Sequence, residues 1–139
     1  MGDRLSVRRL ALLAAAGFLV AGLLGFVPGA TTHYGDLAVA GHGSRAKRVG
    51  VFQVSILLNL VHLAFAVAGA LLARSPAGAR TYLGAGGTAS LVLWVVGVSG
   101  GGGFIPVDRA DNWLHFAAGI GMIGLGYAGS REAPAAAAA

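Results

Sequence analysis

The chain has 139 residues, of which 56% are apolar and 11% are charged, and its mean hydropathy is +0.75. A soluble domain of this length carries roughly 25% charged residues, so the composition argues against an ordinary soluble domain and indicates a membrane protein. There is no cysteine, which excludes disulfides, thiolate metal sites and iron–sulfur clusters, and the 24 glycines show no collagen-like period.

Four apolar stretches follow one another along the chain, each of roughly the length of about 20 residues that crosses a bilayer as a helix. Asp108 and Asp111, which follow Pro106, are typical of a helix start and place the beginning of the fourth stretch. The predicted fold is therefore all-α, a transmembrane four-helix bundle over residues 10–129, with a cytoplasmic segment at 1–9 and a disordered tail at 130–139. The predicted spans are residues 10–27, 50–73, 81–98 and 109–128.

The basic residues predict the orientation of these spans. Nine Arg and one Lys stand against five acids, giving a formal charge of +5, and no predicted face is basic enough for nucleic acid. The N-terminal segment, the second loop and the tail together hold more Lys and Arg than the first and third loops. By the positive-inside rule, both termini are expected in the cytoplasm.

Two of the predicted helices carry the same polar pattern. Asn59 and His62 in the second span, and Asn112 and His115 in the fourth, are spaced three residues apart, with small or flexible residues one and two turns later. These offsets share one helix face. The repetition predicts two helices that meet, or an old duplication, with His115 nearer the outer surface than His62.

Three roles are open for these side chains. In the first, Asn59, His62, Asn112 and His115 hydrogen-bond across helices, to backbone carbonyls or to each other, and only hold the helices together. In the second, His62 and His115 bind haem b, or a metal together with asparagine and Gln53, although the different depths of the two histidines count against haem. In the third, His62 and Gln53 line a path for protons or a small solute, although no acidic residue lies within the apolar part of a span.

Other residues have simpler interpretations. His33, Asp36 and His42 in the first loop are interpreted as solvated rather than metal-binding because their spacing is irregular. Small residues at four-residue spacing predict close helix packing, against a helix of the same chain or a second copy, and substitution of Gly17 or Gly121 by Leu should disrupt it. These stripes are Gly17, Ala21 and Gly25 in the first span, and Ala117, Gly121, Gly124 and Ala128 in the fourth.

Two segments carry a family resemblance, FQVSILLNLVHL at residues 52–63 and FIPVDRADNWLH at residues 104–115. Over residues 10–129 the chain resembles the bacterial four-helix membrane family catalogued as Domain of Unknown Function 4383 (DUF4383). The resemblance implies four transmembrane helices in the plasma membrane and no known activity. Leu58 departs from it, since relatives often carry a histidine there. The recurrent positions correspond here to Gly41, His42, Gln53, Asn59, His62, Pro106, Asp111, Asn112 and His115.

The sequence thus predicts an integral protein of the bacterial inner membrane with a structural or accessory role, no enzymatic activity and no cofactor. The alternatives are a haem- or small-molecule-binding membrane module that uses His62 and His115, with Asn59, Asn112 and Gln53 as further candidates, or a small proton or solute transporter. No catalytic or metal residue is predicted. The expected partners are the lipid bilayer and a second copy or another membrane protein that contacts the small-residue stripes.

Overall fold

The computed structural model describes residues 6–41, 43–100 and 108–130. His42, Pro106, Gly101 to Gly103, residues 1–5 of the predicted N-terminal segment and residues 131–139 of the predicted tail lie outside these ranges. In chain order the elements are α1 (Val7–Leu24), β1 (Thr31–Thr32), a 3₁₀ turn (Tyr34–Asp36), β2 (Lys47–Arg48), β3 (Phe52–Gln53), α2 (Ile56–Leu72), α3 (Pro76–Val98) and α4 (Arg109–Ser130).

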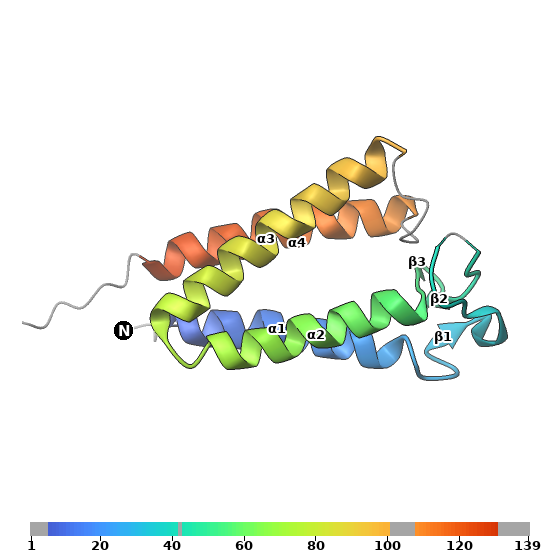
Figure 1. Cartoon of the computed structure of the whole chain (residues 1–139), viewed down its shortest axis with the longest axis horizontal. Helices are drawn as coiled ribbons and strands as arrows, with labels where there is room; N and C mark the ends of the chain where they lie inside the picture. Colours follow the sequence, from blue (N-terminus) through green and yellow to red (C-terminus); the bar gives the residue numbers. More distant parts are fainter. Residues whose placement is uncertain (1–5, 42, 101–107, 131–139) are drawn as a thin grey trace, which may run out of the picture.

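The four helices form two hairpins, α1 with α2 and α3 with α4 (Figure 1). Helices pack more extensively within each hairpin than between the hairpins, and α2 and α4 make little direct contact with each other. The start of α1 and the end of α4 lie at one end of the molecule, and the three strands lie at the other (Figure 1). Four helices, as predicted, are present in the described residues.

Serine caps set the helix starts. The hydroxyl of Ser6 accepts the N–H of Arg9, that of Ser55 accepts the N–H of Leu58, and that of Ser75 caps α3 in the same way. The predicted second span began at residue 50, but α2 begins only at Ile56. The reason is that residues 52–53 pair with β2, and the chain turns into the helix after that pairing.

A small antiparallel sheet in the first loop corrects the all-α prediction. Its order is β1-β2-β3, with Thr31 opposite Arg48 and Arg48 opposite Phe52. Each strand has only two residues, which is too short for an alternating pattern to be visible in the sequence. Because β2 is the central strand, its backbone is held on both sides.

By length and composition, α1 and α3 could each cross a membrane. Within the described ranges, no other helix meets both conditions, and α2 is apolar but has 17 residues. That all four helices cross a bilayer therefore stays a prediction.

Most of the glycines at which the helices approach each other closely are not the ones that the sequence predicted. A Cβ atom on Gly87 would lie 2.8 Å from the carbonyl oxygen of Gly119, and one on Gly22 would lie 2.8 Å from the side chain of Leu63. By contrast, a Cβ atom on Gly17 or Gly121 would meet nothing within 4 Å. The prediction that Gly17 and Gly121 mediate helix contact within this chain is wrong, because other faces of α1 and α4 are turned toward their neighbours. Contact of these glycines with a second copy stays a prediction.

Candidate functional site

The two Asn-x-x-His motifs occupy equivalent places in the two hairpins. In the first hairpin, the Asn59 amide lies against Gly25 at the end of α1, so closely that a Cβ there would collide with it. In the second hairpin, the Asn112 amide lies in the same way against Gly97 near the end of α3. Each asparagine therefore packs within its own hairpin, as an internal duplication would produce.

The histidines of the same motifs face a shared pocket between the hairpins. It has a volume of about 370 Å³, and both His62 and His115 line it. Ser90 contributes from α3, and the other walls belong to α1 and α4. Apart from the two imidazoles and Ser90, the lining is apolar or small: Ala14, Gly17, Phe18, Ala21, Leu114, Ala118, Gly121, Met122 and Leu125.

The two histidines stand at the same distance along their helices. His62 and His115 each follow the first residue of their helix by six positions, since α2 begins at Ile56 and α4 at Arg109. The predicted difference in depth assumed that the second span began near residue 50 and is therefore wrong. Both helices begin at the sheet end (Figure 1), so the imidazoles enter the pocket from parallel helices.

The hydrogen-bonding capacity of the two imidazoles is incompletely used. The carbonyl one turn earlier, of Leu58 for His62 and of Asp111 for His115, faces each ring. Neither Nδ1 atom is aligned well enough to form a hydrogen bond with it or with any other group in the described residues. The ring of His62 stacks on Phe18, with 5.7 Å between ring centroids.

The asparagines do not supply the missing partners. Both amide atoms of Asn59 and the Oδ1 atom of Asn112 are buried without a hydrogen-bond partner among the residues the structure places. In the described residues these three amide atoms therefore form none of the predicted hydrogen bonds across helices. A structural role for the four motif residues stays a prediction.

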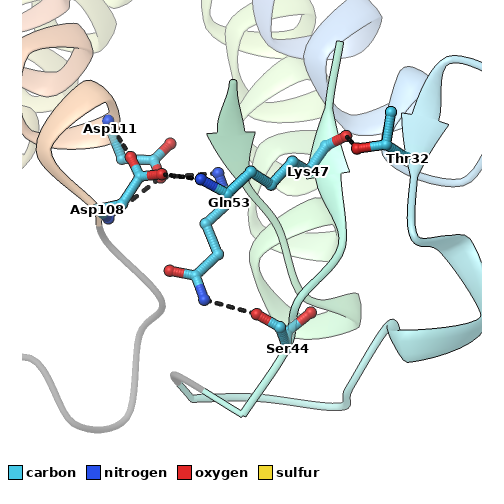
Figure 2. A network of polar contacts seen from close by, with 6 residues as sticks. All are labelled: Thr32, Ser44, Lys47, Gln53, Asp108 and Asp111. Carbon is cyan, nitrogen blue, oxygen red and sulfur yellow. Dashed lines mark hydrogen bonds and ion pairs between the residues drawn. The ribbon is translucent and has the colours of Figure 1, made fainter. Parts of the chain in front are cut away.

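Gln53 lies in the sheet and does not line the pocket. Its Nε2 donates to the carbonyl of Ser44, and its backbone N–H donates to the carboxylate of Asp111 at 3.0 Å (Figure 2). Beside it, the Lys47 ammonium pairs with Asp108 at 3.2 Å (Figure 2). Together these contacts join the sheet to the start of α4.

The predicted helix start at Asp108 is confirmed. The Asp108 carboxylate accepts the N–H of Asp111 at 3.0 Å, and the Asp111 carboxylate accepts the N–H of Asp108 at 3.3 Å. This reciprocal arrangement is a capping box. Burial opposes ionisation of Asp108, but the N–H of Asp111 and the ammonium of Lys47 outweigh it and lower the pKa of that carboxyl.

The first loop holds an ion pair where a metal site was considered. Asp36 pairs with Arg45 at 3.1 Å. In residues 6–41, 43–100 and 108–130, no three His, Asp or Glu side chains gather where they could hold a metal ion.

Comparison with known proteins places the chain in a family. A family model described as a domain of unknown function, DUF4383, matches residues 8–128. The chain belongs to this family. No curated protein and no solved structure matches it.

The structure of this DUF4383 protein also shows functional candidates that sequence reasoning missed. Gly17 and Gly121 leave the space that forms the pocket, and Ser90 forms part of its wall. Arg48 is 4% exposed and donates to the carbonyl of Ala21, another wall residue. The spacing of glycines predicted helix contact at positions 17 and 121, whereas both residues border the pocket. No sequence signal distinguished Arg48 from the exposed Arg45.

Proposed function

We propose that this protein crosses the plasma membrane four times and binds a small, largely apolar molecule in the pocket between its hairpins. The first part is supported by the outward helix faces, which expose large apolar side chains on every helix. Such a surface is unfavourable in water and suits a lipid environment. Examples are Leu13 at 59% exposure in α1, Val67 at 60% in α2, Val92 at 56% in α3 and Ile120 at 54% in α4.

The distribution of basic residues supports an orientation with both termini in the cytoplasm. Arg8 and Arg9 at the start of α1 lie at the same end as Arg74, between α2 and α3, and Arg80, near the start of α3. Arg8 donates to the carbonyl of Ala73 at 2.9 Å, which joins the start of α1 to the end of α2. A basic end is expected on the cytoplasmic side, which leaves the small sheet outside.

The absence of cysteine permits a direct test of this topology. Single cysteines are introduced as Gly43→Cys in the sheet loop and Ala77→Cys at the start of α3, both at exposed positions. A membrane-impermeant maleimide should label the first in intact cells and the second only after lysis. Recovery of the unmodified chain from the aqueous fraction without detergent, or the reverse labelling pattern, would contradict the proposal.

A single observation carries the binding function. Two imidazoles, those of His62 and His115, line one pocket whose remaining walls are almost wholly apolar. A pocket of about 370 Å³ falls within the usual range for small-molecule sites, roughly 300–1,000 Å³, and such sites combine apolar walls with a few polar groups.

The mouth of the pocket supports entry from the bilayer. α1 and α4 supply most of the walls, while His62 and Ser90 reach in from the other two helices. If α1 and α4 both cross the bilayer as proposed, a gap between them opens toward the surrounding lipid. An apolar ligand dissolved in the membrane could therefore enter sideways.

Mass spectrometry of the purified protein tests the binding function. A molecule that copurifies with the wild-type chain should be absent from Gly121→Leu, which fills the pocket, and present in Gly124→Leu. The second variant is a matched control, since Gly124 lies on the same helix, has free space around it and does not line the pocket. Equal retention in both variants would overturn the proposal. A Soret absorption band lost in His62→Ala would identify the molecule as haem.

A further inference from the structure

Arg48 is a buried cation that lies behind the pocket wall, in contact with one of the lining residues. It lies on the central strand β2, is 4% exposed, and one of its guanidinium nitrogens donates to the carbonyl of Ala21. Ala21 lines the pocket, so this hydrogen bond places the guanidinium beside the pocket wall. Pairing of β2 with both neighbouring strands holds the Arg48 backbone in place.

This cation lacks a direct counter-ion. In the part of the chain that the structure describes, Arg48 forms no ion pair and has no hydrogen-bond acceptor other than the Ala21 carbonyl. Burial lowers the pKa of Arg48, and the more distant charge of Asp111 opposes that effect. A guanidinium has five N–H donors and stays charged, so a buried one is stabilised only when carboxylates, phosphates or several carbonyls surround it.

The charge of Arg48 also acts on the pocket itself. It acts on both His62 and His115, two of the three polar side chains that line the pocket. Among the described residues, the acid whose charge acts on Arg48 is Asp111, and it is already bound to the N–H groups of Gln53 and Asp108. The pocket wall near Ala21 is therefore a positive site with donors to spare.

We propose that the pocket takes a single-chain amphiphile with an anionic head, a carboxylate or a phosphate, which Arg48 binds while the apolar chain lies between α1 and α4. This inference rests on the binding function proposed above and specifies the ligand class. Arginine is suited to such a head because its planar fork matches carboxylate and phosphate oxygens. The apolar chain would occupy the space left by Gly17 and Gly121.

Competition binding tests the proposal in a neutral detergent at pH 8. Binding of cis-parinaric acid, a fluorescent long-chain carboxylate, is followed by energy transfer from Trp94 and Trp113. Oleate, oleyl phosphate and oleyl alcohol are the competitors, and they share one chain but differ in the head. For wild type, the two anions should displace the probe at concentrations roughly ten- to a hundredfold lower than the alcohol, as expected for hydrogen bonds to a charged group.

Variants assign the preference to Arg48. Arg48→Gln should reduce the preference to near unity without weakening alcohol binding, and Arg48→Lys should keep part of it. Arg45→Gln is the matched control, because it removes the same charge from an exposed side chain of the same loop. Melting temperatures of all variants are measured alongside. If Arg48→Gln fails to fold, the role of Arg48 is still tested by the wild-type comparison of the two anions with the alcohol and by the same comparison in Arg48→Lys.

Two further arms distinguish the source of the anion. Inorganic phosphate should not displace the probe, because it lacks the apolar chain. In nanodiscs, equal probe binding with phosphatidylglycerol and with phosphatidylcholine would support a free single-chain amphiphile. Weaker probe binding with phosphatidylglycerol would identify an anionic bilayer lipid as the occupant and overturn the single-chain assignment.

Different results would contradict the role of Arg48 and the binding function of the pocket. Equal affinity for oleate and oleyl alcohol in wild type, or a preference that survives in Arg48→Gln, overturns the role of Arg48 alone. If Gly121→Leu binds every competitor as wild type does, the pocket is not the binding site and the proposed function falls with it.

Discussion

The carboxylate of Asp111 accepts a hydrogen bond from the backbone N–H of Gln53, 58 positions earlier, at 3.0 Å. This contact holds β3 against the first turn of α4. His115 lies one turn beyond Asp111, and Arg48 lies opposite Phe52, the neighbour of Gln53. One buried carboxylate therefore fixes the relative positions of the sheet, the cation behind the pocket wall and one of the two imidazoles.

Replacing Asp111 should destabilise the protein strongly, because its carboxylate satisfies two N–H groups. We expect Asp111→Ala to lower the free energy of unfolding by about 1.5–3 kcal/mol, the usual value for a hydrogen bond to a charged group. Asp111→Asn keeps an acceptor oxygen and should lose less. Thermal unfolding in detergent, followed by tryptophan fluorescence, measures both. Equal melting temperatures for the two variants would contradict the role of the acceptor.

A methyl group at Gly25 should collide with the amide of Asn59. Gly25→Ala is expected to cost about 1–3 kcal/mol, the usual penalty for overpacking. Asn59→Ala in the same chain should recover much of that loss, because it removes the colliding atoms. Gly124→Ala, at a position with free space around it, is the control. A double variant no more stable than Gly25→Ala alone would show that the two residues are not coupled.

Ser75 should contribute to stability as the cap of α3. Its hydroxyl accepts the N–H of Gly78 at 3.0 Å, and Pro76 follows at the first helical position. Ser75→Ala should therefore cost about 0.5–2 kcal/mol. Ser99→Ala, in which the lost hydroxyl only donates to the carbonyl of Val95, should change stability little. Chemical unfolding of the three proteins in mixed micelles compares them.

The ion pair of Asp108 and Lys47 should make stability sensitive to acid. The pKa of Asp108 is lowered in the folded chain, so its contribution is complete above the ordinary carboxyl value of about 3.9 and is lost as the pH falls through the lower, folded-state value. Between about pH 5 and pH 2, the melting temperature of wild type should fall further than that of Asp108→Asn. Asparagine still caps the helix. If the melting temperatures of the two proteins fell equally with pH, the charge of Asp108 would not be the cause of the acid sensitivity. Lys47 is 43% exposed, and the effect should be modest.

Much of the helical fold could be predicted from the sequence, because its signals are local. They are the long uncharged runs and the acidic helix start at Asp108, each made by residues that are neighbours in the chain. The sheet could not be predicted, since each two-residue strand exists only through pairing with another, as Lys47 pairs with Thr32 and Gln53. The same pairing moved the start of α2 to Ile56. The predicted offset between His62 and His115 was wrong for this reason alone.

The candidate site was only partly visible in the sequence. The repeated motif indicated His62 and His115 correctly as a pair, because the spacing of a motif survives folding. The roles of Gly17 and Arg48 depend on helix rotation and on a strand seen only in three dimensions. On α4, small residues occur on more than one face, so their spacing cannot tell the packed face at Gly119 from the open one at Gly121.

The hairpin architecture has a consequence for biosynthesis. Since α1 packs mainly on α2, and Arg8 already reaches Ala73 within the first hairpin, the N-terminal half can complete its main contacts before α3 leaves the ribosome. The pocket between the hairpins is complete only when the second hairpin packs onto the first. An amphiphile bound there as proposed would therefore join two halves of the chain that are made one after the other.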